Sequence, residues 1–161
     1  MLTPIVLRGV CFTLTLEPSG SKSRLDRYRN WFVGALTLSS DVSEDLPDLK
    51  ITSEFPHTDL ERLCSRADEH MSALARNHNH DDHPTWGTLD WDFTIQFLDG
   101  MVERQEDTLD GVFSVQVVLL YELSPNPGDW LKGGYEGRVK VEEMIRFCAS
   151  VREYVNSWRQ G

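Results

Sequence analysis

The sequence predicts an α+β fold, a mainly antiparallel β-sheet with two amphipathic α-helices packed on it. Apolar and polar residues alternate strictly over residues 88–97, as a half-buried antiparallel strand requires, and a second run over 112–121 repeats large apolar residues at every second position. Two other segments, 58–77 and 139–158, repeat apolar residues at helical spacing. The chain has 161 residues and no break in composition, so we expect a single domain over residues 1–161.

Strands are expected to come first along the chain. Alternation predicts one strand over 6–17 and another over 28–39, and the polar loop between them indicates a hairpin. An acidic loop should follow at 41–48, and a short strand at 49–55.

The first helix is expected to begin at Thr58. Thr58 and Glu61 match the capping box, in which two side chains satisfy backbone N–H groups at a helix start. The helix should end near Asn77, before the polar loop 77–84. Its apolar stripe comprises Leu60, Leu63, Cys64, Ala67, Met71, Leu74 and Ala75.

The two alternating runs should supply the core of the sheet. The first presents Leu89, Trp91, Phe93, Ile95 and Phe97 on one face. The second presents Phe113, Val115, Val117, Leu119 and Tyr121. The segment 123–137, with two prolines and four glycines, is interpreted as a loop. The final helix has an apolar stripe of Met144, Ile145, Cys148, Val151, Val155 and Trp158.

The cysteines and the N-terminus favour a soluble, reduced, cytoplasmic protein. Cys11, Cys64 and Cys148 lie far apart in apolar patterns, so we expect small buried side chains rather than disulfides. The N-terminus lacks a basic segment followed by a long apolar core, as a signal peptide would have. No apolar run approaches the roughly 20 residues of a membrane span.

The net charge of −10 is concentrated in the middle of the chain. Residues 1–40 hold five Lys/Arg and two Asp/Glu, a net of +3; residues 41–110 hold five and eighteen, a net of −13; residues 111–161 hold six of each. Acidic surfaces repel phosphate backbones, which disfavours nucleic-acid binding and favours a basic protein partner. An acidic face that only keeps the protein soluble is the alternative.

A histidine-rich loop is the strongest candidate for metal binding. It contains His78, His80, Asp81, Asp82 and His83, whose side chains are ligands for zinc or nickel. Consecutive loop residues rarely converge on one ion without a preset turn, and no H-E-x-x-H or paired C-x-x-C is present. We therefore expect a solvated connector, no metal requirement and no cofactor.

No candidate for catalysis has a recognisable context. Asp90 and Asp92 form a carboxylate pair of the kind that hydrolyses glycosides, but the polar face of a strand normally lies in solvent. Ser114 is not in a G-x-S-x-G turn, and the glycines at 133–137 are not followed by G-K-[ST]. We assign no catalytic residue and expect a protein that is not an enzyme.

Two segments carry a resemblance to a known group of proteins. W-G-T-L-D-W-D-F-T-I at 86–95 and D-T-L-D-G-V-F-S-V-Q-V-V-L at 107–119 resemble an uncharacterised bacterial family of small strand-rich proteins. The strand N-W-F-V-G-A-L-T-L at 30–38 also looks like that family. The family looks similar to immunity proteins encoded beside polymorphic or contact-dependent toxins. Such proteins bind and block a cognate toxin domain and are not enzymes.

These observations predict an immunity-type protein that neutralises a basic toxin domain through an acidic surface. Because loops carry recognition more often than strands do, we expect the partner to be bound by Asp41, Glu44, Asp45, Asp48, Asp81 and Asp82. The alternative is a small ligand-binding domain or enzyme with a pocket between the sheet and the helices.

Overall fold

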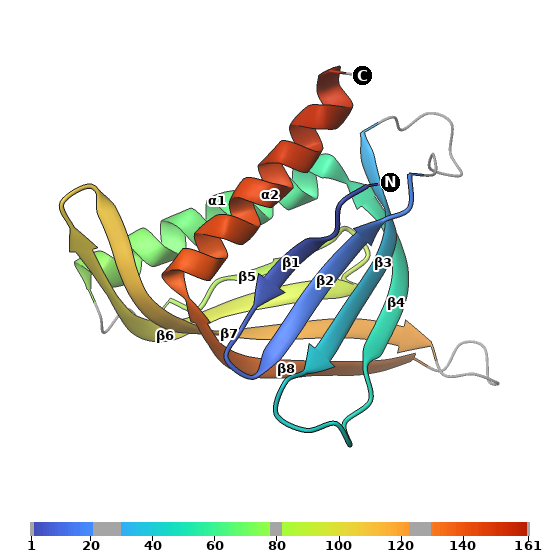
Figure 1. The fold of residues 1–161 in the computed structure, drawn as a ribbon, viewed down its shortest axis with the longest axis horizontal. Coiled ribbons are helices and arrows are strands. Elements are labelled where there is room, and N and C mark those ends of the chain that lie inside the picture. Colours follow the sequence, from blue (N-terminus) through green and yellow to red (C-terminus); the bar gives the residue numbers. More distant parts are fainter. Residues whose placement is uncertain (1, 21–29, 78–81, 123–129, 161) are drawn as a thin grey trace.

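The computed structural model describes residues 2–20, 30–77, 82–122 and 130–160. Within these residues, eight strands form two four-stranded antiparallel sheets, and two helices follow them, one after each sheet (Figure 1). The α+β fold predicted from the sequence is confirmed. The strands are divided between two sheets rather than forming one.

The first sheet contains β1 to β4 in chain order: β1 (Ile5–Arg8), β2 (Phe12–Pro18), β3 (Trp31–Ser40) and β4 (Leu49–Pro56). The single strand predicted over 6–17 is therefore two strands, joined by a tight turn. In this turn the Gly9 N–H donates to the Phe12 carbonyl oxygen at 2.8 Å. The turn shifts the alternation, so Ile5 and Leu7 are buried while Val10 is 65% exposed.

The second sheet contains β5 to β8, again in chain order: β5 (Thr85–Gly87), β6 (Phe93–Gln105), β7 (Thr108–Glu122) and β8 (Trp130–Lys140). The interpretation of the segment 123–137 as a loop is wrong for residues 130–137, which belong to β8. Its glycines allow a close approach to β7, because a Cβ added at Gly134 would lie 2.0 Å from the Val117 carbonyl oxygen.

Both helices have 20 residues: α1 (His57–Arg76) and α2 (Val141–Gln160). The predicted capping box is absent, because α1 begins directly after β4 with Pro56 as its N-cap and no side-chain cap. The helix start is instead fixed by the His57 N–H, which donates to the Asn30 carbonyl oxygen at 2.8 Å. In the described part of the chain, neither helix is long and apolar enough to cross a membrane.

The sheets and helices enclose one hydrophobic core. Figure 1 shows the first sheet standing across the second, with α1 and α2 lying side by side over their open side. α1 contacts mainly β6, whereas α2 contacts mainly β1 and β7. Each helix therefore packs on strands that do not directly precede or follow it in the sequence. All seven phenylalanines lie in this core, at most 1% exposed: Phe12, Phe32, Phe55, Phe93, Phe97, Phe113 and Phe147.

The fold repeats one order of elements. A four-stranded antiparallel meander followed by a helix occurs first as β1–β4 and α1, then as β5–β8 and α2. The sequence shows no matching internal repeat. The two halves nevertheless share a single cluster of buried side chains.

The first alternating run begins later than the sequence predicts. Phe93, Ile95 and Phe97 are buried as expected, but Leu89 is 68% exposed and Trp91 is 57% exposed. The cause is a turn over 88–92, in which the Trp91 N–H donates to the Thr88 carbonyl oxygen at 2.9 Å. Trp91 also has a φ of 55°, which no strand residue adopts. The placement of Leu89 and Trp91 in the core is therefore wrong.

The remaining core predictions are mostly confirmed. The second run buries Phe113, Val115, Val117 and Leu119, and the Tyr121 side chain lies outside the described part of the structure. The stripe of α1 is buried from Leu60 to Leu74. In α2, Ile145 departs from the predicted stripe, because it is 45% exposed.

Candidate protein-binding surface

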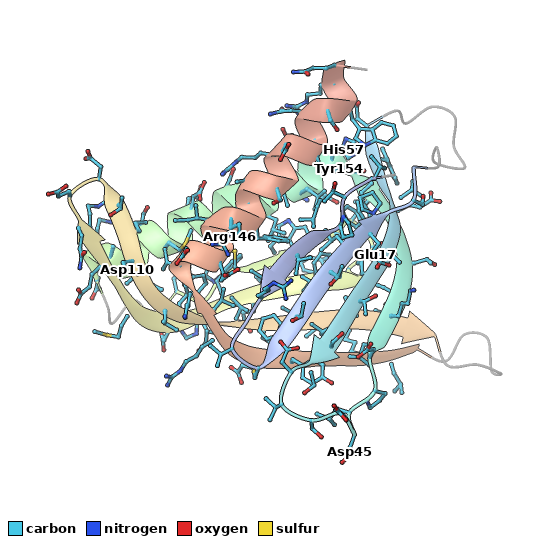
Figure 2. All side chains as sticks on the ribbon, viewed as in Figure 1. Glu17, Asp45, His57, Asp110, Arg146 and Tyr154 are labelled. Carbon is cyan, nitrogen blue, oxygen red and sulfur yellow. The ribbon has the colours of Figure 1, made fainter. Side chains whose placement is uncertain are left out.

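The acidic loop 41–48 joins β3 to β4 at one end of the first sheet. Its four predicted binding residues, Asp41, Glu44, Asp45 and Asp48, are all exposed. Figure 2 shows Asp45 at the outermost part of this loop, pointing away from both sheets. The loop therefore presents its carboxylates to solvent, where a partner can reach them.

Hydrogen bonds to Cys11 and Thr13, and others within the loop, define the shape of this loop. The Asp41 N–H donates to the Cys11 carbonyl oxygen at 2.9 Å, and the Asp41 carboxylate accepts from the Thr13 hydroxyl at 2.8 Å. The Ser40 hydroxyl oxygen accepts from the Val42 N–H at 3.2 Å. The loop is thus tied to β2 and to itself, which reduces the entropy that binding would cost.

Exposed apolar side chains lie in or beside the loop. Val42 is 75% exposed and Leu46 is 48% exposed. Val10 is 65% exposed and is close by, because its neighbour Cys11 accepts the hydrogen bond from Asp41. Apolar anchors surrounded by charged groups are typical of protein interfaces, which have an apolar centre and a polar rim.

The second predicted segment is only partly described. Asp82 is exposed, whereas Asp81, His78 and His80 lie outside the described residues. His83 is 2.9 Å from the Asp99 carboxylate, Nε2 to Oδ1. In the described ranges, no group of three or more His, Cys, Asp or Glu side chains is placed to hold a metal ion.

The two predicted acidic segments are not brought together. In Figure 1, the loop between β3 and β4 is at the bottom of the view, and the C-terminal end of α1, which precedes Asp82, is at the far left. A partner that contacts the 41–48 loop would therefore not contact Asp82 through the same small patch.

An acidic hairpin was not among the predicted binding residues. The end of the β6–β7 hairpin carries four exposed carboxylates and one arginine: Glu103, Arg104, Glu106, Asp107 and Asp110. A β-bulge between Phe97 and Gly100 interrupts the register of the two strands, and such a bulge bends a hairpin. Figure 2 shows Asp110 on this bent end, beside the helices. The run E-R-Q-E-D-T-L-D in the sequence is the signal that could have identified it.

Asp92 is half-buried and forms hydrogen bonds within the protein, whereas the alternation predicts a solvent-facing position on a strand. Its carboxylate accepts hydrogen bonds from the Ser53 and Thr88 hydroxyls, each at 2.5 Å. Ser53 belongs to β4 of the first sheet, so Asp92 connects the two sheets through the turn over 88–92. Asp90, the other carboxylate of this pair, is exposed, as expected for a polar strand face.

We therefore expect Asp92→Ala to lower the free energy of unfolding by about 2 kcal/mol, because two hydroxyls lose a charged acceptor. Asp90→Ala is the matched control, with an expected change within about 0.5 kcal/mol. Urea denaturation monitored by circular dichroism measures both. Equal effects of the two substitutions would contradict the cross-sheet role of Asp92.

Two helix termini enclose a buried histidine. His57 is 2% exposed at the start of α1, and its Nε2 lies 3.4 Å from the Tyr154 hydroxyl of α2. Burial lowers the pKa of His57 to about 4, against small raising effects of the Trp31 backbone and the Glu61 carboxylate. Burial also raises the pKa of Tyr154 to about 12. Both groups are therefore neutral at pH 7 and pack as ring contacts, 5.2 Å between centroids.

The cysteines have the structural role expected from the sequence. Cys64 and Cys148 are buried, and the Cys64 thiol donates to the Cys148 carbonyl oxygen at 3.8 Å across the α1–α2 contact. Cys11 is partly buried, and all three are free thiols. Burial of Cys64 and Cys148 keeps their sulfur atoms away from any solvent-borne substrate.

Comparison with known protein families, with curated proteins and with solved structures gave no match to this chain.

Proposed function

We propose that this protein is an immunity-type binding protein, which neutralises a cognate bacterial toxin domain through its acidic surface. The observation that carries the proposal is the 41–48 loop. It combines exposed carboxylates with the exposed side chains of Val42 and Leu46, on a backbone tied to β2. Such a loop can both attract a basic partner and bury apolar area against it.

The charge distribution supports a basic partner. The −13 net charge of residues 41–110 produces an acidic field that raises the rate of encounter with a positively charged protein. Many toxin domains that act on nucleic acids need a basic surface, since their substrates are phosphate backbones. An acidic protein that covers such a surface competes directly with the substrate.

The alternative function would require a pocket between the sheets and the helices. In the described part of the chain, the interior of that region is filled by buried side chains, among them Phe93, Phe97 and Phe113, each at most 1% exposed. The opening that remains is a groove at the outer edge, between α1, α2 and the β6–β7 hairpin. The binding hypothesis is therefore the better supported of the two.

The test is a charge-neutral variant of the loop, Glu44→Gln, Asp45→Asn and Asp48→Asn combined. Asp41 is left intact because it holds the loop to Thr13. We expect the association rate with the cognate toxin domain to fall about tenfold, with the melting temperature unchanged. The wild-type rate should decrease with salt, since the Debye length falls from about 10 Å at 0.1 M to about 3 Å at 1 M.

A second triple variant controls for total charge. Glu69→Gln, Asp90→Asn and Glu153→Gln remove the same three charges from exposed positions outside the loop. This control should retain most of the wild-type association rate and should protect cells that express the toxin. Equal rates for the two triple variants would exclude the loop as the binding site. Absence of protection by the wild-type protein would refute the immunity function.

A further inference from the structure

A groove of about 480 Å³ lies where α1, α2 and the β6–β7 hairpin meet. Three apolar side chains line it, one from each element: Met71 of α1, Leu109 of β7 and Ile145 of α2. Met71 is buried, Leu109 is half-buried and Ile145 is 45% exposed. The exposure of Ile145, on a helix whose neighbouring apolar residues are buried, is explained by its position at the wall of this groove.

Charged side chains surround the apolar lining. Among the residues that line the groove, Asp68, Asp107 and Glu142 provide three carboxylates and Arg104 provides one guanidinium. Arg152 and Arg146, beside the groove, pair with Asp68 and Glu142. The hairpin adds Glu103, Glu106 and Asp110 around the same end of the molecule. The groove is therefore apolar inside and mainly acidic at its edge.

We propose that this groove binds a basic amphipathic segment of the partner protein, with an apolar residue against Ile145 and Leu109 and lysine or arginine toward the carboxylates. The proposal deepens the proposed function, on which the choice of a toxin as partner rests. An acidic edge around an apolar groove is complementary to a helix with one apolar and one basic face.

A cation from a partner can replace the arginines in the existing ion pairs at the groove with little loss of free energy. Asp68 pairs with Arg152 at 2.6 Å, and Glu142 pairs with Arg146 at 2.9 Å, but these side chains are about half exposed or more. Exposed pairs of this kind stabilise a protein by about 0–1 kcal/mol. Asp107 has no ion-pair partner in the described part of the chain. A cation from the partner can therefore bind Asp107 directly and compete for Glu142.

The experiment titrates the protein with a synthetic helical peptide that has one leucine face and one lysine face. Isothermal titration measures the affinity, and amide NMR shifts locate the site. We expect shifts concentrated on 68–72, 104–109 and 142–145, and about tenfold weaker binding to Ile145→Lys. Asp107→Asn, which keeps the shape of the turn, should weaken binding to a lesser extent.

Leu89→Lys is the control, because Leu89 is also an exposed apolar residue, 68% exposed, and lies near the start of α1, away from the groove. It should bind the peptide as the wild type does, and a peptide with glutamate in place of lysine should not bind. Shifts spread over the whole acidic surface, or equal affinities of Ile145→Lys and Leu89→Lys, would overturn the proposal.

Cell protection separates this proposal from the proposed function. If the wild-type protein protects against the toxin and Ile145→Lys protects less well than Leu89→Lys, the toxin uses the groove. If both variants protect fully, the groove proposal is refuted and the immunity function stands. If the wild-type protein does not protect, the immunity function is refuted, and the peptide titration alone decides whether the groove binds basic segments.

Discussion

Trp86→Ala is expected to lower the free energy of unfolding by about 3–5 kcal/mol, the range for truncating a large aromatic side chain in a core. Trp86 is 3% exposed and contacts Phe93 edge-to-face, with ring centroids 5.0 Å apart. Its indole Nε1–H donates to the Asp59 carbonyl oxygen of α1 at 2.8 Å. The substitution therefore removes apolar contacts and leaves a carbonyl group near the start of α1 without this donor.

Trp91→Ala is the matched control, with an expected loss below about 1 kcal/mol. Trp91 is 57% exposed, and its ring lies over Gly87 at the surface. Urea denaturation of both variants, with Trp86→Phe as an intermediate case that keeps the ring but not the donor, measures the difference. A larger loss of unfolding free energy for Trp91→Ala than for Trp86→Ala would indicate that Trp91 lies in the core, as the alternation predicts.

The same tryptophans show where sequence periodicity is a reliable guide. From Phe93 to Phe97 the alternation predicts the buried face correctly, because strand geometry forces neighbouring side chains to opposite faces. Upstream, Leu89 and Trp91 continue the same spacing, yet they belong to a turn. That turn is fixed by hydrogen bonds to distant groups, including the Leu89 N–H to the Asp59 carboxylate at 3.2 Å. Such tertiary contacts leave no periodic signal.

Turn and strand signals also conflict within β8. Glycine and proline usually mark loops, so the glycines at 133–137 led to the prediction of a loop. The structure instead has a strand there, which pairs with β7 from Val112 to Glu122. The helices were easier to predict, because α1 and α2 carry long apolar stripes. Even there, Ile145 fits the stripe but lies outside the core, since the hairpin that forms the groove covers it only partly.

The candidate binding surfaces differ in how far the sequence could reveal them. The acidity of the loop 41–48 and of the hairpin residues 103–110 can be read directly from the chain. The groove cannot, because it depends on three elements meeting in space: Ser72, Leu109 and Glu142 come from separate parts of the sequence. The bulge at Gly100 contributes by bending the hairpin, and its position is set by pairing with β7.

The stability of the protein should depend on the protonation of His57. An unfolded chain has a histidine pKa of about 6.5, whereas burial lowers the pKa of His57 to about 4 in the folded state. The folded protein thus binds fewer protons than the unfolded chain between these values. Stability from this group is fully present above pH 6.5 and is lost as the pH falls toward 4.

The shift corresponds to about 3 kcal/mol of unfolding free energy. Carboxylates also titrate in the lower part of this range, so the wild-type curve alone does not isolate His57. His57→Gln keeps a polar group beside Tyr154 but cannot take up a proton. We expect urea denaturation of this variant to show a loss between pH 7.5 and pH 4 that is smaller than the wild-type loss by about 3 kcal/mol.

His83→Gln is the control, because His83 has a more exposed side chain and its ring nitrogen contacts the exposed Asp99. It should follow the wild-type dependence on pH, since this variant retains the buried imidazole of His57. Arg159, which also lowers the pKa of His57, provides an independent check: Arg159→Gln should make the loss of stability between pH 6.5 and pH 4 slightly smaller. If His57→Gln and the wild type lose stability in parallel, burial of His57 does not control the acid sensitivity of the fold.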